Sequence, residues 1–466
     1  MLDLSVILND KVFTVMQQAA ELLEIKAYIV GGFTRDVILE RALKNDIDIM
    51  VVGDGPKFAS LTAEILGITN VVIFKNFGTA HFVYNNFNLE FVGARKESYS
   101  KDSRKPIVQD GSFEEDIIRR DFTINTLAIS LNRDSFGEII DSFNGLEDIN
   151  LKIIKTPLNP IETFDDDPLR ILRAFRFASQ LNFKVEDNIL VAASEMAGRL
   201  KIVSQERISD EFIKIIDSDN PSIGLIYLYN TGVLKVIFPE IHNLGGVEQR
   251  KDFHHKDVFY HTCKVVTNIS KVSSNTWLRI AALLHDVAKP ATKRFFEGIG
   301  WTFHGHEDLG ARMIKGIFAR MKFPMHKVEY VENLVRLHLR PMSLVDETVT
   351  DSAIRRLIVQ AGENLDDLIT LCRADITSKN YEKVEKYLEN YEIVMKKVKE
   401  VEEKDELRAF KCPVDGEIIM NVCNLKPSKK VGIIKDAIEE AILEGKIKNN
   451  YEEAYNYLIA IKDTFL

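Results

Sequence analysis

The spacing of hydrophobic and polar positions changes near residue 155 of the 466-residue chain. Before that point, short apolar runs alternate with stretches whose apolar residues recur every three or four positions, which predicts a small sheet with flanking helices. The predicted helices span residues 11–25, 33–43 and 56–66. The predicted strands span residues 26–32, 46–52, 70–76, 79–85 and 89–95. After residue 161, helical spacing dominates to the end of the chain.

Breaks in this pattern divide the chain further. The segment 96–116 is polar and lacks apolar periodicity, so we expect a long mobile loop there. Two prolines in KTPLNP, glycines beside a His/Asp-rich run at 243–257, and a weaker break near residue 378 mark boundaries. The predicted parts are an α+β head with a small mixed sheet over 1–155, a helical neck over 156–245, an all-α domain over 246–378 and a helical tail over 379–466.

Composition restricts the class of protein. No apolar run approaches the roughly 18 residues of a membrane helix, and the first residues lack the features of a signal peptide. The four cysteines show no CxxC spacing, which indicates neither a disulfide framework nor a zinc knuckle. The net charge of −9 argues against a non-specific nucleic-acid coat but allows local basic patches. We therefore expect a cytoplasmic protein without a membrane partner, and no protein partner is indicated.

The predicted strand 46–52 carries two aspartates, Asp46 and Asp48. Because strand side chains alternate, both carboxylates share one face, with Cα atoms about 6.6 Å apart. Such a pair can hold one or two Mg²⁺ ions, which bind the attacking and leaving oxygens in phosphoryl transfer. A lone DxD motif is more often a pair of solvated aspartates, so the prediction needs a second signal.

The second signal is GGFTRD, in which Gly32 lies fourteen residues before Asp46. Two glycines at a strand end let backbone N–H groups approach a phosphate, and the next helix points its positive end there. Arg35 would add a charge-assisted hydrogen bond to a triphosphate. A GG turn alone is usually only a turn, but followed by DxD on the next strand it is far more specific.

These motifs resemble the catalytic head of the class II tRNA nucleotidyltransferase and bacterial poly(A) polymerase family, within the DNA polymerase β-like superfamily. The likeness continues through RRDFTINTLAISL, IIDSFNGLEDINLKII, DDPLRILRAFRFASQLNF and QERISDEFIKII, over about the first half of the chain. The resemblance implies that Asp46 and Asp48 are catalytic and bind Mg²⁺, and that Gly32 and Arg35 bind the nucleotide.

Three further head residues have weaker support. Arg120 and Asp121 in RRDFTIN match the family's contacts to the nucleotide sugar and phosphates, although spacing alone leaves a surface ion pair open. Glu90 lies on a later strand and could be a third acidic group near the metals, although its neighbours differ from the family pattern.

The motif DDPLRILRAFRF offers a way to select a base. A carboxylate only accepts hydrogen bonds and a guanidinium only donates them. Cytosine and adenine present an amino donor beside a ring acceptor, whereas uracil and guanine present the reverse. An Asp167–Arg170 pair therefore fits C and A, and the resemblance places these residues at the family's base-reading pair. Arg173 and Arg176 match its further nucleotide contacts, while Asp166 stands where the family usually has Glu; a helix cap and a solvated arginine face remain the plainer interpretation.

The second half carries histidines in the order of an HD phosphohydrolase domain. The ligand-type residues are His261, His285, Asp286, His306, His338 and Asp375. Imidazole and carboxylate ligands suit several metals, so we expect a second divalent metal of open identity, with His261, His285, Asp286 and Asp375 as its ligands. Activity at this site is open, because an HD domain can also remain as a scaffold. His254, His255 and His304 are expected at the surface.

The tail is rich in lysine and glutamate. Lys426, Lys429 and Lys430 could contact tRNA phosphates, as the family binds tRNA along its helical body and tail. Alternating charge on exposed helices explains such a run more often.

The predicted function is template-independent CCA addition to tRNA from CTP and ATP. A poly(A) polymerase is an alternative, but FKNFGTAHF lacks the arginine pair that such polymerases tend to carry. A CC-only or A-only enzyme is another, although the loop that CC-only relatives tend to shorten is present, with Arg104 and Lys105. The last alternative is a metal phosphohydrolase whose head only binds nucleotides or RNA. Such a head would not need both metal-binding carboxylates, Asp46 and Asp48.

Overall fold

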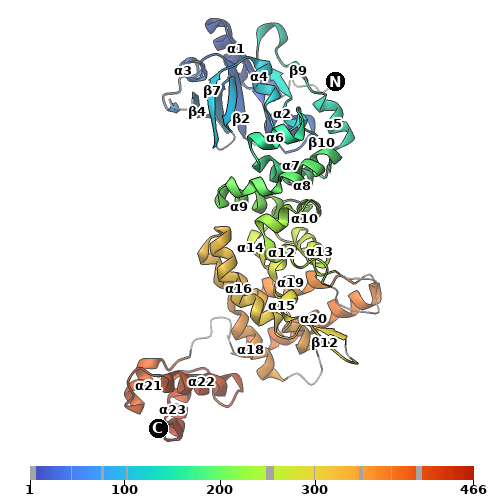
Figure 1. Cartoon of the computed structure of the whole chain (residues 1–466). Helices are drawn as coiled ribbons and strands as arrows, with labels where there is room; N and C mark the ends of the chain where they lie inside the picture. Colours follow the sequence, from blue (N-terminus) through green and yellow to red (C-terminus); the bar gives the residue numbers. More distant parts are fainter. Residues whose placement is uncertain are drawn as a thin grey trace. The chain divides into compact units, whose positions relative to one another are not determined.

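The chain folds into two compact units, Met1–Ile237 and Phe238–Leu466 (Figure 1). The computed structural model describes residues 7–42, 45–74, 78–100, 103–247, 257–298, 300–345, 350–378, 380–405 and 412–465. The first unit contains the sheet and the second is mostly helical. The division into four domains stays a prediction.

A seven-stranded mixed sheet forms the centre of the first unit. Its strands lie in the order β3-β4-β5-β2-β1-β8-β9, with β2 and β5 parallel and the other neighbours antiparallel. They are β1 (Lys26–Val30), β2 (Asp46–Val52), β3 (Val72–Phe74), β4 (Thr79–Tyr84), β5 (Phe87–Gly93), β8 (Ala128–Ser130) and β9 (Ile139–Ile140). The five strands predicted from the sequence are confirmed as β1 to β5.

The two faces of the sheet bury different side chains. One face, which includes Ile49, packs against α1 (Lys11–Leu23) and α3 (Gly55–Leu66). The other face, which includes Met50, packs against α4 (Phe113–Ile118). Both faces of the central strands are thus covered in part, which holds β2 and β5 rigidly in register.

The prediction of a loop over residues 96–116 is wrong, because the backbone there forms regular secondary structure. The chain forms an antiparallel hairpin of β6 (Arg95–Ser100) and β7 (Ser103–Asp110) and then enters α4. A backbone ladder forms this hairpin without the apolar alternation on which the prediction relied. Helix α4 begins with a capping box in which Ser112 and Glu115 bond to each other's backbone, a signal that the sequence analysis overlooked.

Helices make up the rest of the first unit. They are α2 (Gly32–Ile38), α5 (Gly145–Leu151), α6 (Pro160–Asp166), α7 (Leu169–Leu181), α8 (Asp187–Met196), α9 (Gln205–Ile216), α10 (Pro221–Asn230) and α11 (Val233–Ile237). Short 3-10 turns are η1 (Ile7–Asn9), η3 (Thr123–Asn125), η4 (Arg133–Ser135) and η5 (Ala197–Ile202). A parallel bridge joins β10 (Ile153–Ile154) to β11 (Lys184–Val185).

Where the structure describes the second unit, its regular elements are helices and one hairpin. Its helices are α12 (Pro239–His242), α13 (Val258–Ser270), α14 (Thr276–Leu284), α15 (Lys289–Thr292), α16 (His306–Met321), α17 (Val328–Leu337), α18 (Asp351–Ala361), α19 (Leu365–Asp375) and α20 (Tyr381–Asp405). Its 3-10 turns are η6 (Met325–Lys327), η7 (Pro341–Leu344) and η8 (Gly362–Asn364). The hairpin, β12 (Arg294–Phe296) and β13 (Gly300–Thr302), was not predicted.

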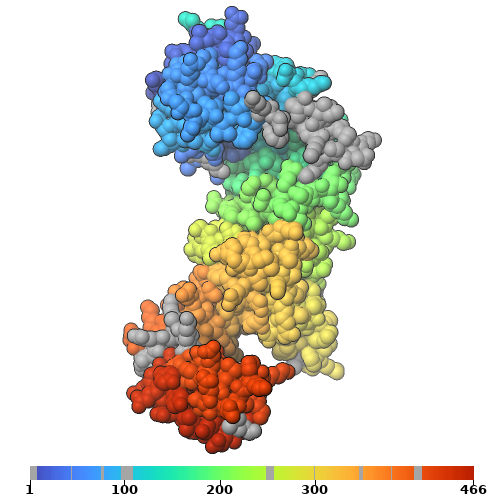
Figure 2. All heavy atoms as spheres, turned by 90° about the vertical axis from the view of Figure 1, so that its left-hand side faces the viewer, coloured from blue at the N-terminus to red at the C-terminus, as the bar shows by residue number. Residues whose placement is uncertain are grey.

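The last three helices have an apolar cluster of their own. They are α21 (Gly416–Cys423), α22 (Lys429–Leu443) and α23 (Tyr451–Phe465), drawn in red in Figure 2. Across the described residues, no helix combines the length and the apolar character needed to cross a bilayer.

Gly224 lets α10 pack closely against α7. Its N–H donates to Ser179 Oγ at 2.8 Å, and a Cβ on Gly224 would lie 2.4 Å from that oxygen and 2.7 Å from Ile215 Cγ2. Close approach of two helices therefore selects glycine here.

We expect Gly224→Ala to lower the free energy of unfolding by about 1–3 kcal/mol, because the added methyl group overpacks this contact. Urea unfolding of the purified protein measures the effect. Gly198→Ala is the matched control, since nothing lies within 4 Å of its Cβ position. Equal midpoints for the two variants would contradict the packing argument.

Candidate functional site

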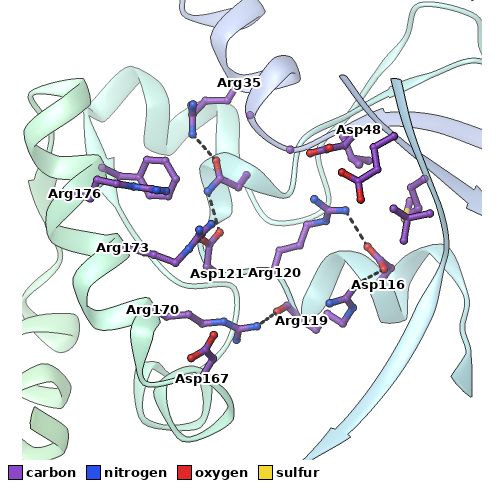
Figure 3. Close-up of a pocket in the computed structure, with 18 of the residues that line it drawn as sticks. Arg35, Asp48, Asp116, Arg119, Arg120, Asp121, Asp167, Arg170, Arg173 and Arg176 are labelled. Atoms are coloured by element: carbon purple, nitrogen blue, oxygen red, sulfur yellow. Dashed lines mark hydrogen bonds and ion pairs between the residues drawn. The ribbon is translucent and has the colours of Figure 1, made fainter. Parts of the chain in front are cut away.

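A basic pocket of about 710 Å³ lies in the first unit, bordered by the sheet, α4 and α7 (Figure 3). Its basic lining residues are Arg35, Arg95, Arg119, Arg120, Arg170, Arg173, Arg176, Arg207 and Lys214. Its acidic lining residues are Asp48, Glu90, Asp116, Asp121 and Asp167. The basic side chains outnumber the acidic ones, so the pocket suits a ligand that carries several phosphates.

Three carboxylates share the face of the sheet at this pocket. Asp46 and Asp48 are exposed on β2 while the residues between and after them are buried, as the alternation predicted. Glu90 on β5 pairs in register with Asp48, and both line the pocket. Asp46 begins β2, where its Oδ1 accepts a hydrogen bond from Asn88 Nδ2 at 2.8 Å.

This acidic face fits a hard divalent cation. Desolvation by the surrounding pocket wall raises the pKa of Asp48, the charges of Glu90 and Asp46 raise it further, and Arg120 opposes them. A cation with oxygen ligands would relieve this clustering of negative charge. Gly31 keeps the approach open, because a Cβ there would lie 3.0 Å from Asp48 Oδ2.

The glycine turn after β1 borders the pocket, but Arg35 already has partners. Gly31, with φ of 77°, precedes α2, and Gly32 is its first residue. The buried Arg35 guanidinium donates from Nε and Nη2 to Asp36 Oδ1 and from Nη1 to Asn125 Oδ1. A triphosphate would have to share or replace these contacts, so nucleotide binding by Gly32 and Arg35 stays a prediction.

Asp121 joins α7 to the head through a buried network (Figure 3). Its Oδ1 accepts from Asn125 Nδ2 at 2.9 Å, and its Oδ2 accepts from Arg173 Nε at 2.7 Å. Burial by itself raises the pKa of Asp121, but Arg173 and Asn125 lower it to about 2. The pair therefore contributes stability above the ordinary pKa of 3.8, and this is lost as the pH falls towards 2. The predicted contact of Asp121 with the nucleotide is untested, whereas its contact with Arg173 is present.

Arg176 is buried on α7. Its Nη1 donates to Glu211 Oε1 at 3.1 Å, and its guanidinium lies 4.3 Å from the centre of the Phe177 ring. Burial lowers the pKa of Arg176 to about 10, and Glu211 opposes the shift. Arg35 and Arg173 approach the same ring, at 4.9 and 5.5 Å. Phe177 therefore holds three guanidinium groups together at the pocket wall.

Helix α4 holds Arg120. Asp116 accepts from Arg119 Nη2 at 2.6 Å and from Arg120 Nη2 at 3.0 Å. Burial alone would raise the pKa of Asp116, but the two arginines lower it. Within the described part of the chain, Arg120 Nε is buried without a hydrogen-bond partner. Arg120 is thus fixed beside Asp48, and its Nε–H remains available as a hydrogen-bond donor.

Asp167 and Arg170 lie beside one another at the pocket, each with other partners (Figure 3). Asp167 Oδ1 accepts from Leu169 N at 3.1 Å at the start of α7, and its Oδ2 accepts from Arg207 Nη2 at 3.0 Å. Arg170 Nη2 donates to the carbonyl oxygen of Arg119 at 2.7 Å. An acceptor and a donor with fixed positions therefore face the same cavity.

Sequence reasoning missed several of these residues. They are Asp116, Arg119, Asn125, Phe177, Arg207 and Glu211. Phe177 and Arg207 lie inside motifs that were recognised, but their roles depend on partners far away in sequence. Spacing along the chain cannot show such partners.

In the second unit, all six ligand-type residues of the HD-like motifs come together. His261 Nε2 lies 2.9 Å from Asp375 Oδ1, and His285 Nε2 lies 3.1 Å from Asp286 Oδ2. Two groups share Asp286, one completed by His261 and His285 and the other by His306 and His338. Within each group the ligand atoms lie within 4.8 Å of one another.

The histidines are held so that Nε2 faces this cluster. Each of the four histidines forms a hydrogen bond through Nδ1 with a group outside the cluster. In chain order the partners are Thr377 Oγ1, Ala282 O, Phe303 O and Val335 O, at 2.9, 2.7, 2.8 and 2.7 Å. Outer bonds of this kind orient metal-binding imidazoles.

The electrostatics of the cluster also fit a divalent metal. His285 Nε2 and Asp286 Oδ1 are buried, and their polar neighbours belong to the cluster itself: Asp286 Oδ2 lies 3.1 Å from His285 Nε2, and His306 Nε2 lies 3.3 Å from Asp286 Oδ1. Burial alone would lower the pKa of His285, but Asp286 and Asp375 raise it to about 10. The two carboxylates thus strongly favour a positive charge at the centre of the cluster. Burial lowers the pKa of His338 to about 4, which keeps it a neutral ligand.

The remaining predicted residues lie at the surface or outside the described residues. Lys426, Lys429 and Lys430 are exposed before and at the start of α22, and their contact with RNA stays a prediction. His304 is exposed as predicted. His254 and His255 lie outside the described residues.

Comparisons with known proteins agree with both sites. Residues 27–155 match the Poly A polymerase head domain, residues 182–244 match the probable RNA and SrmB- binding site of polymerase A, and residues 258–380 match the HD domain. The Multifunctional CCA protein of Haemophilus influenzae (strain PittGG) is 31% identical over 370 residues, which are 75% of this chain and 84% of that protein. This chain belongs to the CCA-adding enzyme and poly(A) polymerase family.

Other members of the family are similar over different lengths. The A-adding tRNA nucleotidyltransferase of Aquifex aeolicus (strain VF5) is 41% identical over 207 residues, which are 44% of this chain and only 24% of that protein. A crystal structure of a tRNA nucleotidyltransferase with a primer tRNA and an incoming ATP analog is 26% identical, with a TM-score of 0.59, over 82% of this chain and 98% of that chain.

Membership of this family confirms the predicted mixed-sheet head with a mostly helical remainder. The protein is a nucleotidyltransferase of the family and carries an HD domain. Both kinds of domain typically depend on divalent metals.

We expect the HD cluster to retain a divalent metal through purification and Asp286→Asn to lose it, because both groups share this carboxylate. Mass spectrometry of the metal content, with and without prior loading with Mn²⁺, measures this. His304→Ala is the control, since His304 is exposed and outside the cluster. Equal metal content in Asp286→Asn and the wild type would contradict the assignment.

Proposed function

We propose that this nucleotidyltransferase is a template-independent CCA-adding enzyme, which transfers CMP and AMP from CTP and ATP to the 3′ end of tRNA and releases pyrophosphate. The main support is that Asp48 and Glu90, on the acidic face, and Asp167 and Arg170, on the helical side, border one basic pocket. The names of its relatives point the same way, since one is called a CCA protein and a solved structure holds a primer tRNA with an ATP analog.

The reaction is an attack by the tRNA 3′-hydroxyl on the α-phosphate of the nucleotide. Mg²⁺ held by Asp46 and Asp48, with Glu90 beside them, supplies charge neutralisation at the reacting oxygens when it is bound. Arg120 and Arg173 are already fixed by Asp116 and Asp121, so they can meet phosphate charge without reorganising. Positioning and neutralisation are sufficient for this transfer, and no covalent protein nucleophile is needed.

Base selection falls to the other side of the pocket. Asp167 accepts and Arg170 donates, which fits the pairing edges of cytosine and adenine and opposes those of uracil and guanine. Arg207 holds Asp167 from the far side, which leaves the carboxylate less freedom to turn. One fixed pair can thus serve both nucleotides of the CCA end without a nucleic-acid template.

Nucleotide incorporation tests the proposal. A tRNA that ends at the discriminator base should gain three nucleotides ending in A when both CTP and ATP are present, and an unstructured RNA should gain none. Long A tails on either RNA would identify a poly(A) polymerase instead. No incorporation on any RNA would overturn the transferase proposal and leave the HD domain as the active part.

Asp48→Asn should reduce both CMP and AMP incorporation about 1,000-fold, because losing the carboxylate removes about 4 kcal/mol of transition-state stabilisation. Single-turnover assays with saturating Mg²⁺ measure the loss. Asp134→Asn, an exposed aspartate in η4, is the control. A loss confined to one nucleotide would contradict a shared catalytic centre.

Asp167→Ala should increase incorporation of UMP and GMP relative to CMP and AMP by about tenfold, since one hydrogen bond to the base is worth about 1.5 kcal/mol. Competition between nucleotides on one tRNA measures this ratio. Asp165→Ala is the control, because Asp165 lies two residues away and pairs with Arg199. An unchanged ratio would show that Asp167 does not read the base.

An A-only enzyme is the second candidate, favoured by the 41% identity to the A-adding protein over 207 residues. It would extend a tRNA that already ends in CC and ignore one that ends at the discriminator base. A CC-only enzyme would stop after two nucleotides.

For the HD domain, we propose a metal-dependent phosphohydrolase. The support is the largely buried cluster of four histidines and two carboxylates with inward-facing Nε2 atoms. Exposed Lys426, Lys429 and Lys430 are proposed to contact tRNA phosphates.

A further inference from the structure

The hairpin β12–β13 exposes aromatic side chains beside the HD cluster. Phe295, Phe296 and Trp301 are 51%, 48% and 37% exposed. Figure 1 shows the hairpin projecting from the helices of the second unit, and this yellow segment lies on the outer surface in Figure 2. A two-stranded hairpin gains little stability by itself. Three large exposed rings on so short an element therefore indicate a surface that binds a ligand.

Two of the rings and one lysine form one face of this hairpin. Phe295 and Trp301 face each other across the strands, with ring centres 5.1 Å apart at 70°. Lys293 Nζ lies 4.3 Å from the centre of the Trp301 ring. Arg294 and Phe296 alternate with Phe295 and so point to the opposite face. Aromatic rings beside a lysine on one face suit bases joined by phosphates.

The hairpin leads directly into the HD cluster. Phe303 follows β13, and its carbonyl oxygen bonds to Nδ1 of His306 at 2.8 Å. The Phe303 ring lies 5.6 Å from Lys289 Nζ, and that ammonium lies 2.6 Å from Asp286 Oδ2. A nucleic-acid strand bound along the hairpin would therefore have its phosphates next to the ligand-type residues of the HD cluster.

We propose that the β12–β13 hairpin binds single-stranded RNA. Unpaired bases stack on Phe295 and Trp301, while Lys293 on the same face meets the adjacent phosphates. Charge favours RNA over a protein partner, because Glu297 is the one acidic residue among the described residues 293–302. The binding does not depend on CCA addition in the head.

The chain offers a local reporter for this binding. It contains two tryptophans, Trp277 and Trp301. Trp277 packs half-buried against Phe318 and Phe323, so Trp277→Phe leaves Trp301 as the single emitter on the hairpin. The probe is hexauridylate, because uracil is a base that the Asp167–Arg170 pair opposes and it should avoid the head pocket.

Titration of the Trp277→Phe protein with hexauridylate should quench Trp301 emission, and the affinity should fall as salt increases. Phe295→Ala in the same background should weaken binding about tenfold, because one stacked base is lost. Tyr381→Ala, which removes an 89% exposed ring from α20, is the control and should change nothing.

Two results would overturn the proposal. One is unchanged Trp301 emission at the highest RNA concentration, which would show that the hairpin does not bind RNA and would favour a protein partner. The other is equal affinity in Phe295→Ala. Anisotropy of labelled hexauridylate with the wild-type background gives the same answer if Trp277→Phe does not fold. CCA addition should be normal in Phe295→Ala, so failure of the transferase proposal and failure of this one remain distinguishable.

Discussion

The ion pair between the buried Asp121 carboxylate and the half-buried Arg173 guanidinium joins the sheet-bearing head to helix α7, and the rest of the pocket depends on it. Through Asn125 the same network reaches Arg35 at the start of α2, close to the glycine turn beside Asp48. Charges buried in this way are costly unless they are paired, so the network can exist only when α7 is docked in register. The acidic face and the side of the pocket that carries Asp167 and Arg170 are therefore positioned by one interaction.

The HD cluster is built on the same physical rule with different ligands. Helix-borne histidines are oriented by bonds from Nδ1 to three backbone carbonyls and one hydroxyl, all outside the cluster. The negative charge of Asp286 and Asp375 then has histidines and Lys289 as its neighbours. In both sites, other protein groups hold the side chains from behind, and the inner face is left for phosphate or metal.

The sequence predicted the parts of these sites that depend on local periodicity. Alternation placed Asp46 and Asp48 on one face, and the histidine motifs identified all six residues of the HD cluster. It could not show that Arg35 is bonded to Asn125, 90 positions away, or that Arg207 holds Asp167. The hairpins β6–β7 and β12–β13 were missed because backbone pairing, and not side-chain alternation, forms them.

Asp121→Asn tests most directly whether this network positions the transferase site. It removes the charge that holds Arg173 and replaces one accepting oxygen by an amide donor, while keeping the size of the side chain. Single-turnover incorporation should fall for CTP and ATP by the same factor, at least about tenfold for a charged hydrogen bond, with the preference for C and A retained. Unchanged rates in a folded variant would contradict the account, because the pocket would then be held in place without this ion pair.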